Sequence, residues 1–244
     1  MNPLYFTAKG PRSSNEDSYL IHALEKGILL IVADGLGGHK GGKYASHYAT
    51  TNFLKKLNSL NEINILNLEN ILQDIHEELI ILGSENKDLY GMGTTLTCAY
   101  IDSENKLIGV HTGDSRAYLL RENGLIQLTI DHTEAQKLFD EGLISKEELL
   151  NYPRKNILVS ALGARSNQLL VNSFEYQLEV KDRLLLSSDG FYASITKKEI
   201  RDISIKFEEF SEFFFNILCY VKNTEPKDNY SVVGIEIDLY ESKL

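Results

Sequence analysis

The stretch Gly27–Gly42, GILLIVADGLGGHKGG, decides the fold. Its first seven residues form an apolar run typical of a β-strand, and the run stops abruptly at Asp34. A glycine-rich turn follows and leads into a segment with helical spacing. The pattern therefore predicts a strand, a tight turn and a helix, with an aspartate exposed where the strand ends.

The same arrangement of a strand followed by an acid recurs along the chain. Leu184–Gly190 (LLLSSDG) places Asp189 just after a second apolar strand. Asp228 precedes the last strand, Asp114 lies between two β-like runs, and Glu16 and Asp17 precede another strand. A single aspartate at such a position is ordinarily a turn residue that bonds its own backbone. Five such motifs favour a shared site.

Convergence of these carboxylates would require a counter-ion. Two carboxylates ~4 Å apart repel each other by roughly 4 kcal/mol at an effective dielectric constant of about 20. Divalent cations relieve that repulsion. The chain has neither paired cysteines nor a His-x-x-x-His spacing, so the oxygen-rich set favours Mg²⁺ or Mn²⁺ over zinc.

The composition excludes several classes of function. The 35 acidic and 25 basic residues give a formal net charge of −10, which would repel nucleic acid and an anionic membrane. The start, MNPLYFTAKGPRSSNED, lacks the features of a secretory signal. No stretch reaches the ~20 apolar residues of a membrane span. We therefore expect a cytoplasmic protein with no nucleic-acid or membrane partner.

Periodicity predicts a mixture of strands and helices. Six β-like runs are Gly27–Ala33, Thr94–Asp102, Leu107–Thr112, Arg116–Arg121, Asp182–Ser187 and Tyr230–Leu239. Three segments with helical spacing begin near Tyr44, Leu68 and Phe207. Short polar turns between the middle runs indicate hairpins and hence antiparallel sheet. We expect one domain over residues 1–244, with a polar flap containing two short helices at about residues 130–156.

The motifs, in this order, resemble those of metal-dependent type-2C protein serine/threonine phosphatases, also called the PPM family, and in particular its short bacterial members. They are Gly-x-Arg-x-x-Asn-Glu-Asp (10–17), Asp-Gly-Leu-Gly-Gly-His (34–39), Gly-Thr-Thr (93–95), Gly-Asp-Ser-Arg (113–116), Ser-Asp-Gly (188–190) and Asp-Asn-x-Ser (228–231). Leu-Thr-Ile-Asp-His (128–132) resembles the start of the flap in the bacterial members. Six ordered motifs across almost the whole chain are far more specific than any one of them.

The resemblance implies an α+β fold, a four-layer α-β-β-α sandwich of two antiparallel sheets flanked by helices, with a flap insertion and metals at one end of the sheets. It implies two Mn²⁺ or Mg²⁺ ions, with a possible third in a weaker site. By the family pattern, Asp34 bridges two ions, the Gly35 carbonyl binds one, and Asp189 and Asp228 bind the other. Asp114 with Asp189 would hold the weaker third ion.

Other roles also follow from the resemblance alone. Arg12 matches the arginine that grips the phosphate, and Glu16 and Asp17 would order metal-bound water. The implied reaction is hydrolysis of phosphoserine and phosphothreonine monoesters by direct attack of a metal-bridging water or hydroxide. The implied partners are phosphorylated proteins, substrates of a serine/threonine kinase, in a signalling role, and we expect a monomer. Leu36 stands where eukaryotic members have a histidine proposed as general acid, so the acid stays unassigned.

Two rival functions must be weighed against this one. Gly37–Lys43 fits the Gly-x-x-x-x-Gly-Lys loop of a nucleotide hydrolase, but Tyr44 replaces the serine or threonine that would bind magnesium. Asp34 at the loop entrance would also repel nucleotide phosphates. The other rival is a catalytically silent pseudophosphatase that binds phosphoproteins, which loss of a ligand acid would have favoured. His39 is expected to play a structural role in the glycine turn.

Overall fold

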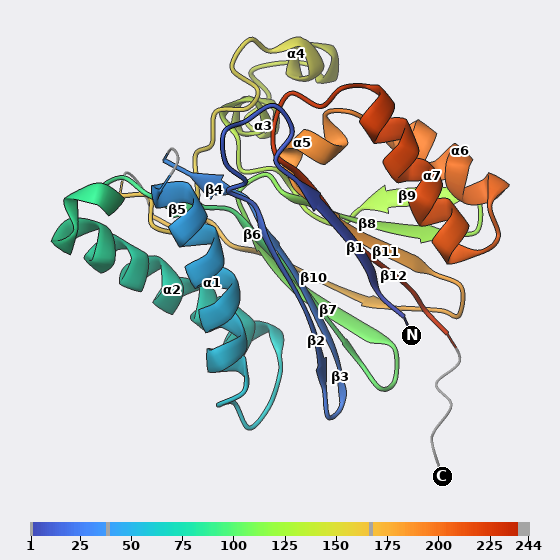
Figure 1. Cartoon of the computed structure of the whole chain (residues 1–244), viewed down its shortest axis with the longest axis horizontal. Coiled ribbons are helices and arrows are strands. Elements are labelled where there is room, and N and C mark those ends of the chain that lie inside the picture. The colour runs from blue at the N-terminus through green and yellow to red at the C-terminus, as the bar shows by residue number, and fades with distance from the viewer. Residues whose placement is uncertain (1, 38–39, 166–167, 239–244) are drawn as a thin grey trace.

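Two five-stranded antiparallel sheets form the centre of the molecule in this computed structural model, which describes residues 2–37, 40–165 and 168–238 (Figure 1). The first sheet has the order β1 (Leu4–Ala8), β12 (Tyr230–Glu236), β11 (Arg183–Ser187), β8 (Arg116–Arg121) and β9 (Gly124–Gln127). The second has the order β10 (Asn172–Gln177), β7 (Lys106–Thr112), β6 (Leu96–Asp102), β3 (Gly27–Ala33) and β2 (Ser18–Leu24). The short strands β4 (Gly35–Leu36) and β5 (Gly93–Thr94) pair beside them.

Helices cover the outer face of each sheet, so the layers run helix, sheet, sheet, helix (Figure 1). The helices α1 (Gly41–Leu57) and α2 (Ile65–Glu85) pack on the second sheet, and the 3₁₀ turn η1 (Lys87–Leu89) follows them. The helices α6 (Lys197–Lys206) and α7 (Phe210–Asn223) cover the first sheet. The predicted α+β sandwich of antiparallel sheets is confirmed.

Strand β3 shows why its sequence lacks polar alternation. Leu29 and Ile31 face the helices α1 and α2, where they join Phe53, Leu72 and other buried side chains. Ile28, Leu30 and Val32 point the other way, into the core between the two sheets. Because side chains alternate along a strand, a strand buried on both faces must be apolar at every position.

Strands β11 and β12 follow the same rule from the other sheet. Leu184, Leu186 and Val233 enter the core between the sheets. Leu185 and Val232 instead pack against the aromatic face of α7. The two sheets therefore share one continuous apolar layer, and each has a second apolar layer beneath its helices.

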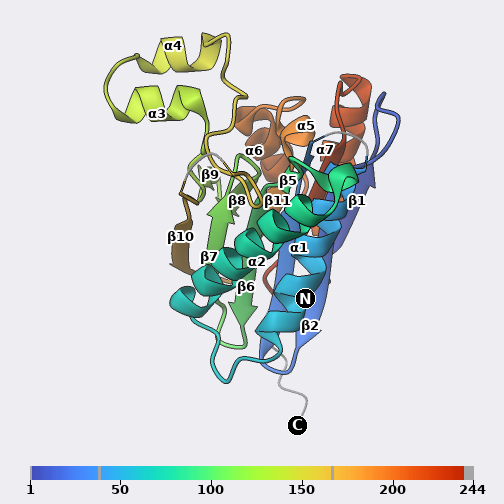
Figure 2. The same ribbon diagram turned by 90° about the vertical axis from the view of Figure 1, so that its left-hand side faces the viewer.

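The flap leaves the sandwich as a closed excursion between β9 and β10. It contains α3 (Glu134–Asp140) and α4 (Lys146–Asn151), the two short helices predicted for this segment. A bridge between Thr133 and Leu158 brings its two ends together. Figures 1 and 2 show the flap projecting beyond the sheets, at the end of the molecule where the short helix α5 (Asp189–Tyr192) begins.

Several predicted boundaries were wrong. The run Thr94–Asp102 divides into β5 and β6 because Thr95 turns its hydroxyl and its N–H to the backbone of Asp34. The helix predicted to begin near Phe207 begins at Phe210, because Phe207 is the residue that caps the C-terminus of α6. Helix α6 itself was not predicted, since it is mostly polar and only its Ile200 is buried. Strand β12 ends at Glu236, and Leu239 lies outside the described residues.

No helix in the part of the chain that the structure describes is long and apolar enough to cross a lipid bilayer.

Leu30→Ala should destabilise the protein by about 2–5 kcal/mol, because it removes a fully buried side chain from the layer between the sheets. Leu66→Ala is the matched control, since 65% of the Leu66 side chain is exposed on α2. Urea unfolding of both variants measures the difference. Equal losses of stability in Leu30→Ala and Leu66→Ala would contradict the burial of Leu30 between the two sheets.

Candidate metal centre

The strand registers bring the acid-bearing turns to one edge of the sandwich. Ser18 at the start of β2 pairs with Ala33 at the end of β3, and Thr97 near the start of β6 pairs with Val32. In the other sheet, Ser187 at the end of β11 pairs with both Arg116 and Val232. Every acid predicted for the site follows or precedes a strand at this edge, which we call the carboxylate edge: Glu16, Asp17, Asp34, Asp114, Asp189 and Asp228.

Asp17 joins the two sheets. It directly precedes β2 of the second sheet. Its carboxylate is buried and faces the first sheet. Oδ2 accepts hydrogen bonds from the hydroxyls of Ser188 (2.8 Å) and Ser231 (2.6 Å). Oδ1 is buried and has no hydrogen-bond partner among the described residues. Burial raises the pKa of Asp17 to about 7, although the two serine hydrogen bonds oppose the shift.

Asp34 is fixed through its backbone. Its N–H donates to Thr95 Oγ1 (2.9 Å), and its carbonyl accepts from Thr95 N–H (2.9 Å) and Thr94 Oγ1 (2.9 Å). The side chain lies close enough to those of Asp17, Asp189 and Asp114 for their charges to act on it. Burial, reinforced by the charges of Asp17, Asp189 and Asp114, raises the pKa of Asp34 well above its usual range.

Asp189 and Asp228 complete the group on the side of the first sheet. Asp189 begins α5 directly after β11, and its Oδ1 is buried with no hydrogen-bond partner in the described part of the chain. Burial raises the pKa of Asp189, and the Asp228 charge adds to the shift. Asp228 is more open, and its Oδ2 lies 2.6 Å from Arg12 Nη2 in an ion pair.

Asp114 approaches from the turn between β7 and β8. It is buried, and burial together with the Asp189 carboxylate raises its pKa to about 8. The next residue, Ser115, shares a hydrogen bond of 2.6 Å with Thr95 Oγ1. Since Thr95 also accepts from the backbone of Asp34, the positions of Asp114 and Asp34 are linked.

Asn229 holds the loop that carries Arg12 and Glu16. Its Nδ2 donates to the carbonyls of Lys9 (2.8 Å) and Ser14 (2.9 Å), and its Oδ1 accepts from Glu16 N–H (2.9 Å). Gly10, at a φ of +55°, passes so close that a Cβ would lie 2.3 Å from the Asp228 carbonyl. Arg12 is therefore held at the rim, where its side chain is 59% exposed.

The turn around Gly35 is equally tight. A Cβ on Gly35 would lie 2.3 Å from the Gly42 carbonyl, and one on Gly42 would lie 2.1 Å from Glu16 Oε2. These close approaches place the start of α1 and the Glu16 carboxylate beside Gly35. His39 of the same turn lies outside the described residues.

Sequence reasoning selected the acids and missed the residues that hold them. The missed residues are the other members of the same motifs: Thr94 and Thr95 of Gly-Thr-Thr, Ser115 of Gly-Asp-Ser-Arg, Ser188 of Ser-Asp-Gly, and Asn229 and Ser231 of Asp-Asn-x-Ser. For Ser115, Ser188 and Asn229 the signal was a hydroxyl or amide directly beside an acid, and Ser231 lies three residues after Asp228. Thr94 and Thr95 have no acid nearby in the sequence, so only their motif marked them. Such side chains bond backbone and carboxylate groups and so fix a turn.

The donors suit hard divalent cations, which take oxygen ligands. The buried and unpartnered Oδ1 atoms of Asp17 and Asp189 need a partner, and a cation would provide one. As they stand, no three histidine, cysteine, aspartate or glutamate side chains within residues 2–37, 40–165 and 168–238 form a group that could hold a metal ion. The carboxyls are nevertheless near enough for the charges of Asp17, Asp189 and Asp114 all to act on Asp34.

Comparison with known proteins gives one consistent result. Residues 11–228 match the family model described as Protein phosphatase 2C. The chain is 33% identical over 236 residues to the serine/threonine phosphatase stp of Listeria innocua, covering 94% of this chain and 93% of that protein.

Two solved structures show the same fold. The serine/threonine phosphatase Stp1 from Staphylococcus aureus superimposes with a TM-score of 0.87 at 29% identity, covering 97% of this chain and 94% of that one. The catalytic domain of the phosphatase PstP, solved in complex with two manganese ions, gives 0.80 at 29% identity, covering 97% of this chain and 98% of that one.

The raised pKa values predict how stability depends on pH. A carboxyl whose folded pKa lies above its unfolded value of about 3.9 stabilises the folded state at low pH and loses that contribution as pH rises through the folded pKa. Without divalent cations, the contribution of Asp114 should therefore disappear between about pH 4 and pH 8. In the presence of a chelator, the melting temperature should fall less between pH 4 and pH 8 for Asp114→Asn than for the wild type.

Adding Mn²⁺ at pH 8 should restore stability, because the cation binds the deprotonated carboxylates. At 100 times the dissociation constant the gain is about 2.7 kcal/mol, or roughly 5–10 °C in a domain of this size. The same concentration of K⁺ is the control. A melting temperature that Mn²⁺ leaves unchanged would argue against a metal centre at the carboxylate edge.

Proposed function

This chain belongs to the protein phosphatase 2C family, and we propose that the carboxylate edge is its catalytic metal centre. The protein is a metal-dependent serine/threonine protein phosphatase, an enzyme that acts on phosphorylated proteins. The observation that carries the proposal is the gathering of Asp17, Asp34, Asp114 and Asp189 at one edge, with pKa values raised by burial and by the charges of neighbouring carboxylates. Nothing in the fold or the comparisons favours the nucleotide hydrolase or the silent binding protein.

We propose the ligand roles that the sequence motifs indicated. Asp34, Asp189 and Asp228 would be the chief carboxylate ligands, with the Gly35 carbonyl beside Asp34. Asp114 would join Asp189 at a weaker site. The raised pKa values of Asp34 and Asp189 support these roles, since buried carboxyls that disfavour their own charge are stabilised by a bound cation. A cation would bind these carboxyls in their deprotonated form.

Manganese or magnesium, two ions with a possible third, is the cofactor that we propose. PstP, a structural neighbour, is described in complex with two manganese ions, and every proposed ligand here is an oxygen. Bound ions would neutralise the carboxylates, acidify an attacking water molecule and stabilise the charge that develops on the phosphoryl group. We propose direct attack by that water, with no phospho-enzyme.

The chain's own residues supply positioning. Thr95 and Thr94 hold the backbone of Asp34, and the serine hydroxyls orient the Asp17 carboxylate between the sheets. Glu16 and Asp17 would then accept hydrogen bonds from water at the centre. Because these contacts exist before substrate arrives, little reorganisation is needed during the reaction.

Arg12 is the proposed phosphate grip. Its guanidinium lies at the exposed rim and touches Asp228, so a phosphate that binds there would meet both a cation and the proposed metal ligands. The guanidinium fork suits two phosphate oxygens. In a chain of net charge −10, a cation at this position also offsets the repulsion of an anionic substrate.

The finer features of the enzyme are proposals of the same kind. We propose one catalytic domain over residues 1–244, a monomer, and substrates phosphorylated by a serine/threonine kinase. A cytoplasmic location stays a prediction from the sequence.

Asp34→Asn should lower Mn²⁺-dependent hydrolysis of a phosphothreonine peptide by on the order of 10²–10³-fold or more, because it removes a charged ligand. The fold should survive, since the hydrogen bonds that hold Asp34 are made by its backbone N–H and carbonyl, which the substitution leaves in place. Asp102→Asn, in a turn at the opposite end of the sheet, is the matched control and should retain activity. Unchanged turnover in a folded Asp34→Asn variant would contradict the ligand role.

Arg12→Ala should raise KM for the same peptide by about tenfold while changing kcat less, because a binding contact worth about 1.4 kcal/mol is lost. Arg12→Lys should recover part of the loss, since it keeps the charge but not the fork. Arg201→Ala, on α6, removes an arginine elsewhere and serves as the control. Initial rates over a range of peptide concentrations separate the two constants. An unchanged kcat/KM in Arg12→Ala would show that Arg12 does not bind phosphate.

A further inference from the structure

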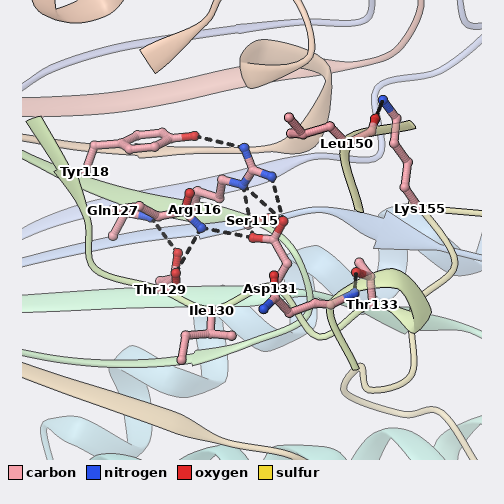
Figure 3. Close-up of polar contacts among 12 residues, drawn as sticks. Ser115, Arg116, Tyr118, Gln127, Thr129, Ile130, Asp131, Thr133, Leu150 and Lys155 are labelled. Carbon is pink, nitrogen blue, oxygen red and sulfur yellow. Dashed lines mark hydrogen bonds and ion pairs between the residues drawn. The ribbon is translucent and has the colours of Figure 1, made fainter. Parts of the chain in front are cut away.

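Arg116 and Asp131 belong to two sequence motifs, Gly-Asp-Ser-Arg and Leu-Thr-Ile-Asp-His, yet the proposed reaction uses neither. The structure pairs them (Figure 3). Arg116 Nε lies 3.0 Å from Asp131 Oδ1, and Nη2 lies 2.6 Å from Oδ2, so the guanidinium binds the carboxylate through two nitrogens. Gln127 Nε2 also donates to Asp131 Oδ1 (3.1 Å). Most of both ionic side chains is hidden from solvent.

The same guanidinium contacts the element that carries a proposed metal ligand. Its central carbon lies 3.7 Å from the centre of the Tyr192 ring. Tyr192 is the last residue of α5, the short helix that begins with Asp189. Nη1 also donates to the Tyr118 hydroxyl (3.3 Å). Arg116 therefore lies between α5 and the base of the flap and contacts both.

A second attachment lies beside the first. His132 N–H donates to the Gly113 carbonyl (2.7 Å), and Gly113 N–H donates to His132 Nδ1 (3.2 Å). Gly113 is the residue before Asp114. The base of the flap is thus bound on both sides of Asp114, by Gly113 and by Arg116.

The flap is also held together internally. Glu134 at the start of α3 accepts a hydrogen bond from the Tyr152 hydroxyl (2.9 Å) and pairs with Arg154 (2.8 Å). Because these contacts join the two arms of the flap, the flap can change its orientation relative to the sheets mainly at its base. The fork of Arg116 on Asp131 and its stack on Tyr192 fix that direction, because both contacts require a defined orientation of the guanidinium plane.

We propose that Arg116 is a positioning residue that holds the flap beside the carboxylate edge and so favours phosphorylated polypeptides over small phosphate esters. This inference rests on the proposed phosphatase function. The flap projects beyond the sheets at the end where α5 begins, so it is placed to contact a polypeptide bound at the carboxylate edge (Figures 1 and 2). A small ester needs only the carboxylate edge.

The same strand provides a matched control. At the other end of β8, Arg121 binds Asp182 with the same fork, Nε to Oδ1 at 2.9 Å and Nη2 to Oδ2 at 2.7 Å. That pair lies away from the carboxylate edge and the flap, next to the 460 Å³ hollow lined by Glu179 and Arg183. Arg116→Met and Arg121→Met thus each remove a two-nitrogen fork on an aspartate, and only the first touches the flap. Arg121 also pairs with Glu179 (2.5 Å), so its loss is at least as large a change in ionic contacts.

The test measures kcat/KM for a phosphothreonine peptide and for para-nitrophenyl phosphate at saturating Mn²⁺. Arg116→Met should lower the peptide value by about tenfold or more, since a displacement of about 1 Å can cost that much, and should change the small-ester value by less than threefold. Arg121→Met should leave the ratio of the two values unchanged. Arg116→Lys, which keeps the charge without the fork, should fall between the wild type and Arg116→Met.

Hydrogen exchange locates the effect. Arg116→Met should increase deuterium uptake in residues 131–157, whereas Arg121→Met should not. An equal loss on both substrates, or a ratio that Arg121→Met changes as much, would overturn the proposal. Wild-type protein without activity on either substrate would instead refute the phosphatase function, and the exchange result would still decide whether Arg116 holds the flap. If Arg116→Met does not fold, Asp131→Asn removes the same ion pair and is judged by the same outcomes.

Discussion

Mutual repulsion among buried carboxylates is the constraint on which this structure depends. Burial raises the pKa of Asp17, Asp34, Asp114 and Asp189, and the charges of neighbouring carboxylates, Asp228 among them, add to the shift. Such an arrangement lowers the stability of the folded state, so the surrounding structure must be rigid enough to keep the carboxylates together. Two antiparallel sheets joined through one apolar layer provide it, because packed interiors resist small displacements. The enzyme therefore spends part of its folding free energy on holding together groups that repel.

The helices and glycines bring the carboxylates into place in different ways. The outer helices bury the far face of each sheet and keep the strand ends in register. The glycine turns allow backbone segments to approach more closely than side chains permit, as at Gly35 and Gly42. Hydroxyl and amide side chains then bind the turns to one another. The positions of the acids therefore depend on the hydrogen bonds that their uncharged neighbours make.

Much of this could be predicted from the sequence. The strand Gly27–Ala33 is apolar at every position because both of its faces are covered, and its observed bounds are those predicted. The acids were recognised because each interrupts or precedes an apolar run, and the motif order identified the family. Helix α6 was missed because it is short and mostly polar, so few apolar residues mark its buried face. The pairing of Arg12 with Asp228 could not be predicted, since it depends on β1 and β12 lying side by side. The pairing of Arg116 with Asp131 depends on how the chain turns back after the β8–β9 hairpin.

Strand β12 lies between β1 and β11, although it is the last strand along the described chain. It also carries Ser231, and Asp228 and Asn229 directly precede it. During synthesis, β1 therefore has no partner strand until residue 236 has been made. Until Asp228 and Asn229 have been made, the carboxylate edge also lacks its last acid and the amide that holds the Arg12 loop. An unfinished chain would expose two unpaired strand edges, which are prone to aggregation. It would also be inactive, so the cell would acquire phosphatase activity only with chains extended through that strand.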